Sequence, residues 1–597
     1  MNDIRTRYSL AQFRSEMSEL LEQLRICKTP DEVRTILFHW VNQCQRQAFS
    51  QPQIKWNRNL NIIRDCARAM RSLLSPHGEV ASGESLATVL FEISHDRCPE
   101  NLTPAFFAEV THLLRGVALH PEPESFDMAN HFETLEGREA ALARSDDLDG
   151  LWQHVEERMG RYADGLTPEA LERRRRRRGQ ILSVLGATEA EWNDWRWQTK
   201  NIVSSLATLE RLVRLSPDER RSVEQACCSG LPFGITPYYL SLFDDDLEAG
   251  RDKALRAQVI PDLDLVQQTA TSPDARKRDF DFMREADTSP VDLITRRYPA
   301  ICIFKPFNTC PQICSYCQRN WEIDQAMAPG ALAPREKIEA ALTWIREHRC
   351  IREVLVTGGD PLAMGNETIE FILERLAGID HVDLIRFGSR VPVTMPMRID
   401  GELAALLGRF REPGRREICL VTHVEHPYEL TPEVVSAVDR VRKQGIGVYN
   451  QLVFQFFVSR RFESTKLRML MRRIGIDPYY TFVPKGKQET RNYRVPIARI
   501  LQEQREEARL LPGIRRTDEA VYNLPALGKN HLRAQQHRDF VGIRPDGSRV
   551  YEFHPWEKNI IDRGTYVGDD VPVLTYLERL AEWGENIDDY SGIWYYY

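Results

Sequence analysis

The chain lacks several features that would place it in a specialised class. No apolar run approaches the roughly 20 residues needed to cross a bilayer, and the stretch from Met1 to Arg7 has no apolar core of a secretory signal. It also has no large excess of charge, because 80 Lys and Arg residues stand against 87 Asp and Glu residues, a net charge of −7. That balance argues against a protein whose main task is to coat nucleic acid. We therefore expect a cytoplasmic protein without membrane or nucleic-acid partners.

Cysteine is scarce as well, with 12 residues among 597, far below the density of a disulfide scaffold. Hydrophobic residues make up 42 % of the chain and charged residues 28 %, as in a globular protein that buries large cores. These absences favour a cytoplasmic enzyme.

The first third of the sequence predicts helices without a catalytic pattern. Apolar residues recur at helical spacing in five segments, residues 15–26, 31–41, 62–74, 86–93 and 104–119. The composition changes after residue 120, and the stretch that begins there ends in six consecutive arginines, Arg173 to Arg178. Such a run could bind RNA, lipid or another acidic surface, but acidic neighbours such as Glu172 favour a solvated helix face or a linker. We expect residues 1–185 to form an α-helical extension of unassigned role with an Arg-rich linker at its end.

The sequence pattern is different from residue 300 to residue 485, where short β-branched or aromatic segments alternate with helix-like stretches. This alternation predicts βαβ units, a parallel sheet and an α/β fold. The six expected strands are residues 300–304, 353–357, 382–387, 417–422, 445–452 and 478–483. Polar or glycine-rich turns follow four of them, and in a β/α barrel such turns share one rim. Six strands suggest a partial barrel over residues 291–485, with a helical lead-in at 186–290 and a C-terminal segment at 486–597.

Three cysteines stand apart because of their spacing. Cys310, Cys314 and Cys317 follow the first expected strand in the pattern C-x3-C-x2-C. A structural zinc site normally has four protein ligands, and no fourth cysteine lies nearby. Three thiolates on one loop suit a [4Fe–4S] cluster in which one iron has no protein ligand. The amino and carboxylate groups of S-adenosylmethionine can bind that iron.

With this motif the chain resembles the radical S-adenosylmethionine (SAM) aminomutases of the lysine 2,3-aminomutase family. The resemblance extends from about Trp192 to about Trp556 and leaves residues 1–185 outside. Its other motifs are Ile235-Thr-Pro-Tyr-Tyr, Arg297-Tyr-Pro, Gly358-Gly-Asp-Pro, Arg386-Phe-Gly-Ser-Arg, and His423 with His426-Pro. The resemblance implies a partial (β/α)6 radical-SAM barrel with a C-terminal segment that binds pyridoxal 5′-phosphate (PLP), preceded here by the helical domain.

The resemblance also assigns roles to residues. Cys310, Cys314 and Cys317 would hold the cluster, and the residues that would bind SAM are Gly358, Gly359, Asp360, Ser389, Arg390, His423 and Gln451. Two glycines allow close approach of backbone to a ligand, and a carboxylate suits an ammonium group.

The PLP site would be formed around Lys529, in a segment matching the one whose lysine binds the cofactor covalently. The family usually has a glycine-rich run there, whereas this chain has Ala526 and Leu527 and is one residue shorter. Arg297 and Tyr298 match the phosphate-binding region. Ile301 replaces a second arginine of that strand, and Lys305, four residues further on the same strand face, is our hypothetical substitute.

The expected substrate follows from three positions. Arg319 matches the arginine that binds the substrate α-carboxylate. Lysine-specific members bind the distal ammonium with two aspartates, and here Lys485 and Asn523 occupy those positions, as in glutamate 2,3-aminomutases. A cation and an amide would repel an ammonium but bind a side-chain carboxylate. An error in the alignment, in which Lys487 takes the position given to Lys485, would remove this argument.

The sequence thus predicts an isomerase, a radical SAM and PLP-dependent 2,3-aminomutase that converts L-glutamate to β-glutamate. We expect a one-electron reductant of the flavodoxin or ferredoxin type as a partner, and a homo-oligomer. The last cysteine is Cys419, so we expect no zinc site of C-terminal cysteines like that of some members.

Three alternatives remain at this point. The enzyme could act on lysine or on another amino acid with an acidic or neutral polar side chain. It could modify a lysine carried by a protein. Finally, it could be a non-enzymatic binding or regulatory protein that docks partners through its helices and arginines, although the three cysteines and Lys529 argue against this.

Overall fold

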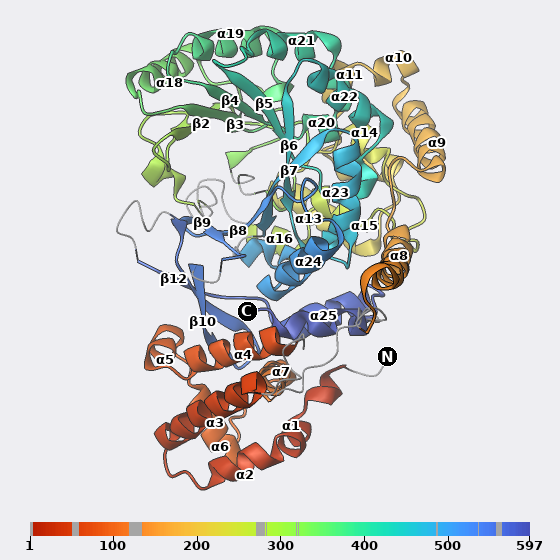
Figure 1. Ribbon diagram of the computed structural model, residues 1–597. Coiled ribbons are helices and arrows are strands. Elements are labelled where there is room, and N and C mark those ends of the chain that lie inside the picture. The colour runs from red at the N-terminus through yellow and green to blue at the C-terminus, as the bar shows by residue number, and fades with distance from the viewer. Residues whose placement is uncertain are drawn as a thin grey trace. The chain divides into compact units, whose positions relative to one another are not determined.

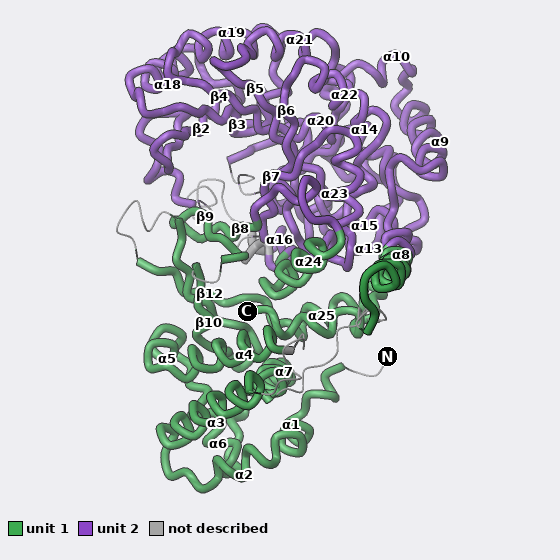
Figure 2. The backbone as a smooth tube through the Cα atoms, viewed as in Figure 1, with its two compact units in different colours: residues 1–155, 494–510, 520–597 green, residues 156–493, 511–519 purple. Residues whose placement is uncertain are grey.

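A computed structural model describes residues 4–50, 59–118, 134–269, 281, 283–317, 319, 322–484, 488–534, 537–556 and 564–597. The chain divides into two compact units (Figure 2). Unit 1 contains residues 1–155, 494–510 and 520–597, and unit 2 contains residues 156–493 and 511–519. The N-terminal helices therefore share a compact unit with most of the C-terminal segment, whereas the sequence suggested an extension by itself. Among the described residues, no helix has the length and apolar character needed to span a membrane.

Unit 2 is built on a parallel sheet whose strands lie in chain order. Its strands are β2 (Ile301–Phe307), β3 (Glu353–Gly358), β4 (Leu384–Gly388), β5 (Glu417–Thr422), β6 (Gly447–Val453) and β7 (Ile476–Val483). Each pairs in parallel with the next, and the short β1 (Ile294–Thr295) pairs antiparallel with β2. All six strands expected from the sequence are confirmed. Because the strands are parallel, the turns that follow them gather at one edge of the sheet.

Amphipathic helices connect the strands and run along the sheet (Figure 1). They are α18 (Arg335–Glu347), α19 (Asn366–Ala377), α21 (Gly401–Arg409), α22 (Pro432–Lys443) and α23 (Glu463–Arg473). In α22, Val434, Ala437, Val438 and Val441 are buried, which is the i, i+3, i+4, i+7 face of a helix packed on one side. The nine residues of α21 include glycines at 401 and 408, which weaken its helical pattern in the sequence.

A series of helices precedes the sheet in unit 2. They are α9 (Pro168–Leu185), α10 (Glu189–Trp192), α11 (Trp195–Lys200), α12 (Leu206–Leu212), α13 (Pro217–Ser229), α14 (Pro237–Leu240), α15 (Lys253–Val259) and α16 (Leu263–Thr269), with α20 (Val391–Thr394) after β4.

The arginine run lies within α9. Arg174 and Arg177 are buried, and their guanidinium groups pair with Glu433 at 3.0 Å and Asp245 at 2.7 Å. Arg175 pairs with Glu172 at 2.6 Å. Part of this run therefore packs into unit 2 through ion pairs instead of forming an open cationic surface.

Unit 1 combines helices from both ends of the chain with a small sheet. Its helices are α1 (Leu10–Glu16), α2 (Ser18–Arg25), α3 (Pro30–Ser50), α4 (Asn59–Leu73), α5 (Pro76–Ser82), α6 (Leu86–Ser94), α7 (Pro104–Val117), α24 (Ile497–Leu510) and α25 (Val573–Glu582), while α8 (Gly137–Gly160) contains the boundary at residue 155. The hairpin of β8 (Glu519–Leu524) and β9 (Gly528–His531) precedes the antiparallel sheet of β10 (Arg538–Ile543), β11 (Arg549–Phe553) and β12 (Tyr566–Asp569). The expected N-terminal helices are confirmed, although residues 15–26 fall in two helices that meet at Met17.

A buried ion pair joins distant segments in the core of unit 1. The Arg549 side chain of β11 is fully buried and donates to the Glu109 carboxylate of α7 at 2.6 Å. It also donates to the backbone oxygens of Trp594, at 2.7 Å, and Tyr596. The indole of Trp594 stacks on the His112 ring of α7 with centroids 4.4 Å apart. Burial raises the pKa of Glu109 although Arg549 opposes this shift, so the carboxylate depends on its arginine partner.

We predict that Glu109→Ala lowers the free energy of unfolding by about 3–5 kcal/mol, because it leaves the Arg549 charge buried without its carboxylate. Urea unfolding of the full chain measures this loss. The matched control, Glu224→Ala, removes an exposed ion pair with Arg220 and should cost less than about 0.5 kcal/mol. Equal effects of the two substitutions would contradict the role of the buried pair.

Candidate active site

The cysteine loop begins where β2 ends. Cys310, Cys314 and Cys317 follow this strand, and backbone bonds fix the loop, with the Ser315 N–H donating to the Gln258 oxygen at 2.8 Å. Burial raises the pKa of Cys310 well above its usual range, and nearby acidic groups add to this effect. Burial also raises the pKa of Cys314 to about 11. Thiolates at these positions therefore need a compensating positive centre.

The Gly358-Gly359-Asp360 turn after β3 is packed against the start of that loop. The Gly359 N–H donates to the Phe307 oxygen at 2.7 Å, and the Asp360 N–H donates to the Thr309 oxygen at 2.8 Å. Gly358 has a φ of +109°, and a Cβ on Gly359 would lie 2.0 Å from the Thr309 oxygen. From the sequence, these glycines are expected to allow the approach of a ligand. The structure gives a further reason, the close approach of two backbone segments.

The Asp360 carboxylate joins the turns after β3 and β4. One oxygen accepts from the Ser389 hydroxyl at 2.6 Å and the Leu362 N–H at 3.2 Å. The other accepts from the N–H groups of Arg390 at 2.8 Å and Val391 at 3.0 Å. Burial raises the pKa of Asp360 to about 6, although these donors oppose the shift. Asp360 and Ser389 therefore lie together and hold the two turns in register.

Arg390 connects this pair of turns to the cysteine loop. Its guanidinium donates to the Cys314 sulfur at 2.8 Å, to the Glu429 carboxylate at 2.7 Å and to the side-chain oxygen of Gln258. Its Nε donates to the backbone oxygen of His423 at 3.1 Å. The Arg390 charge lowers the pKa of Cys314 against the effect of burial. Arg390 is thus a fixed cation at a cysteine sulfur.

The turn after β5 contributes further buried groups. Burial, aided by the Arg390 charge, lowers the pKa of His423 to about 4, and its ring bonds to the backbone of Gln451. The imidazole is therefore neutral at pH 7. Burial raises the pKa of Glu425 to about 8, and a carboxyl oxygen of this side chain accepts from the Val453 N–H at 2.8 Å. Glu425 is not among the residues to which the sequence assigns a role.

Two expected ligand-binding cations lie near each other in unit 2 and are paired with carboxylates. Arg319 donates to Glu285 at 2.6 Å and to Glu322 at 3.0 Å. The Lys305 ammonium lies 3.0 Å from Glu285 and 3.7 Å from Glu322. Glu322 lies three residues after Arg319 in the sequence, whereas Glu285 lies 34 residues before it and gave no local signal.

The remaining expected cofactor residues of unit 2 flank β1 and β2. Arg297 donates to the backbone oxygen of Met283, and Tyr298 is half-buried in the turn before β2. The expected substrate residue Lys485 and its neighbour Lys487 lie outside the described residues.

In unit 1, the β8–β9 hairpin pairs Asn523 directly with Lys529. Directly opposed residues of an antiparallel pair point to the same face, with Cβ atoms about 4.5–5.5 Å apart. The Lys529 ammonium lies 5.9 Å from the centroid of the Trp556 ring, and His531 packs on that ring with centroids 4.3 Å apart. Sequence reasoning paired neither Asn523 nor Trp556 with Lys529, because the pairing depends on the length of the hairpin loop.

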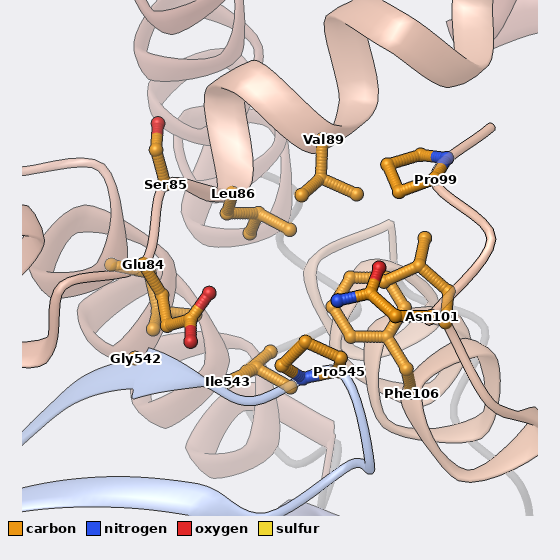
Figure 3. Close-up of a pocket in the computed structure, with 12 residues that line it drawn as sticks. Glu84, Ser85, Leu86, Val89, Pro99, Asn101, Phe106, Gly542, Ile543 and Pro545 are labelled. Atoms are coloured by element: carbon orange, nitrogen blue, oxygen red, sulfur yellow. The ribbon is translucent and has the colours of Figure 1, made fainter. Parts of the chain in front are cut away.

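Unit 1 also contains a pocket of about 220 Å³ that includes none of these residues. Leu86, Val89, Phe106, Ile543 and Pro545 form apolar walls, with Glu84 and Asn101 at the polar side (Figure 3). Glu84 pairs with Arg544 at 3.0 Å. This pocket is separate from the residues expected to bind cofactors.

Comparison with known proteins identifies the family. An uncharacterized KamA family protein, MJ0634 of Methanocaldococcus jannaschii, is 47 % identical over 604 residues, which cover 98 % of this chain and 96 % of that protein. The chain belongs to the KamA family. The radical SAM superfamily model matches residues 304–411, a range that contains the three cysteines, Asp360 and Arg390.

Named KamA-family homologues of this chain are aminomutases, which are isomerases. Glutamate 2,3-aminomutase of Clostridioides difficile is 33 % identical over 54 % of this chain and 72 % of its own length. L-lysine 2,3-aminomutase of Clostridium subterminale is 32 % identical over 52 % of this chain and 71 % of its own length. Nearly equal identities to both leave the substrate of this KamA-family chain undecided by comparison alone.

The radical SAM domain implies a [4Fe–4S] cluster and SAM, and the residues present fit them. The donor set is three thiols on one loop, and an iron cluster supplies the positive centre that buried thiolates need. Arg390 donates to one of these sulfurs, which stabilises a thiolate through a charge-assisted bond.

We predict that Gly359→Ala prevents assembly of the cluster, because the added Cβ would collide with the Thr309 backbone and displace the cysteine loop. After anaerobic reconstitution, the parent chain should hold about four irons and the variant fewer than about one. Gly401→Ala is the matched control, since a Cβ there meets nothing within 4 Å. Full iron content in the Gly359 variant would contradict the explanation.

Proposed function

We propose that this KamA-family chain is a radical SAM, PLP-dependent 2,3-aminomutase that moves the α-amino group of L-glutamate to C3 and gives β-glutamate. The observation that carries the proposal is the direct pairing of Asn523 with Lys529 on one face of the β8–β9 hairpin. It combines the amine expected to bind PLP with an amide suited to a substrate carboxylate. We further propose that the parallel sheet of unit 2 is a partial (β/α)6 barrel and that residues 486–597 contain the PLP-binding segment.

The cofactors would be held by the residues to which the sequence assigns these roles. Cys310, Cys314 and Cys317 would bind the cluster, and Gly358, Gly359, Asp360, Ser389, Arg390, His423 and Gln451 would surround SAM. Lys529 would bind PLP, with Arg297, Tyr298 and Lys305 toward its phosphate. When bound, the cluster and SAM supply a carbon radical that removes a hydrogen atom, and PLP supplies the conjugated system that allows nitrogen migration.

The protein's own part is to position charges. Arg390 donates to the Cys314 sulfur and connects three turns, so the cysteine loop cannot shift independently of them. Neutral His423 can accept or donate one hydrogen bond without adding charge. Arg319 is held by two carboxylates, and we propose that the substrate α-carboxylate takes the place of one of them. A one-electron reductant of the flavodoxin or ferredoxin type would supply the reducing electron.

The charges at the expected distal site favour glutamate over lysine. Asn523 is a neutral amide and Lys485 is a cation, so neither can neutralise the ammonium of a lysine side chain. A glutamate side chain would instead gain a charge-assisted hydrogen bond from Lys485 and a second hydrogen bond from Asn523.

We predict that the reduced, reconstituted enzyme converts L-glutamate to β-glutamate and leaves L-lysine unchanged, as product analysis by chromatography would show. Lys485→Asp should reduce turnover of glutamate by about 100-fold or more, since it places a second anion beside the substrate carboxylate. The matched control is Lys487→Asp, which should retain turnover. Rearrangement of lysine, or full activity of the Lys485 variant, would contradict the assignment of glutamate as the substrate.

A separate prediction concerns Lys529. Lys529→Ala should abolish the covalent binding of PLP, because the variant has no amine to bond to the aldehyde. Absorbance after gel filtration, with and without borohydride reduction, measures the bound cofactor. Lys28→Ala, which removes an exposed lysine of the same unit, should bind PLP like the parent. Equal loading of both variants would show that another lysine holds the cofactor.

A further inference from the structure

Four side chains of the kind that bind metal ions converge on the small sheet of unit 1. Asp539 lies on β10, Glu552 on β11, His554 directly after β11, and His77 near the start of α5. The ligand atoms of Asp539, Glu552 and His554 all lie within 4.8 Å of one another. His77 Nε2 lies 2.6 Å from the Glu552 carboxylate, and His554 Nε2 lies 3.1 Å from that of Asp539.

Strand register explains why three of these residues meet. The β10–β11 pairing places Asp539 directly opposite Glu552, so both side chains point to one face of the sheet. His554 is two residues beyond Glu552, and the period of two along a strand returns it to the same face. The pairing continues past the strand end, since the His554 N–H donates to the His537 oxygen at 2.8 Å.

The fourth side chain comes from a different part of the chain. His77 is the second residue of α5, whose N-cap is Ser75 and whose first residue is Pro76. The Ser75 hydroxyl accepts from the Gly78 N–H at 2.9 Å, which fixes the first turn of the helix. A Cβ on Gly78 would lie 3.2 Å from the Val541 oxygen, so α5 approaches β10 closely and brings His77 to Glu552.

With both histidines neutral, the two carboxylates give this group two negative charges. Two carboxylates directly opposed across strands repel each other. Glu552 is only 6 % exposed, and its charge is compensated by the contact with His77. Both histidines present Nε2, the nitrogen through which neutral imidazole commonly binds metal ions. Two imidazoles and two carboxylates together form a donor set that a divalent ion neutralises.

We propose that His77, Asp539, Glu552 and His554 bind one zinc ion. Zinc prefers four nitrogen, sulfur or oxygen ligands in a tetrahedron, at about 2.0–2.2 Å from nitrogen and oxygen donors. Such a tetrahedron places its ligand atoms about 3.4 Å apart, so the donors of Asp539, Glu552 and His554, now within 4.8 Å of one another, need to move only about 1 Å. The His77 donor already lies 2.6 Å from the Glu552 carboxylate. Four protein ligands leave no open position, which is the arrangement of a structural site. The ion links the N-terminal α5 to strands near the C-terminus within unit 1.

The test uses the full chain without an affinity tag, after its cysteine site has been loaded with iron and excess metal has been removed. Elemental analysis after incubation with Zn²⁺ and gel filtration should find about one zinc per chain. The zinc should also raise the midpoint of thermal unfolding, because a metal that binds only the folded state stabilises it.

Variants separate this site from other ligands. His554→Ala and His77→Ala should each lose the bound zinc and the thermal shift, whereas His39→Ala, which removes an exposed histidine of α3, should keep both. His77 is itself exposed, so its variant tests the proposal even if His554→Ala fails to fold. Absence of zinc from the parent chain, equal zinc in the His77 variant, or preferential retention of Mn²⁺ in a competition with Zn²⁺ would overturn the proposal.

Discussion

The guanidinium of Arg390 is the contact on which the cysteine site depends. It reaches the Cys314 sulfur in the loop after β2, the His423 oxygen in the turn after β5, and the buried carboxylate of Glu429. Its own backbone N–H is held by Asp360 after β3. A buried cation is stable only with such partners, so the same bonds that satisfy Arg390 fix the turns of four strands relative to one another. The cysteine loop is positioned as a consequence.

Much of unit 2 could be predicted from the sequence. The six parallel strands are short β-branched or aromatic segments, and the turns after them carry the residues that the structure brings together. The partners that complete the network could not be predicted in this way. Gln258 comes from α15, far before the cysteines, and Glu285 precedes the sheet, so no local spacing connects them to Arg390 or Arg319. Asp360 and the glycines before it were identified, but their backbone contacts with Thr309 required the structure.

Residues 1–155 share the compact unit 1 with C-terminal segments of the chain. The buried pair of Glu109 and Arg549 joins an N-terminal helix to a C-terminal strand, and the same compact unit contains Lys529 and Asn523. The match to the Methanocaldococcus jannaschii protein spans 98 % of this chain, whereas matches to the named aminomutases span about half. These helices are therefore shared with a KamA-family relative, and α4 and α5 pack against β10 in the compact unit that contains Lys529.

The three cysteines would hold a cluster with one iron open to the amino and carboxylate groups of SAM. Electron–nuclear double resonance on the reduced, reconstituted chain tests this most directly, with SAM labelled by ¹⁵N in its amino group and ¹⁷O in its carboxylate. The account predicts magnetic coupling of both labels to the cluster. A cluster signal that is unchanged by SAM, with no coupling to either label, would contradict it.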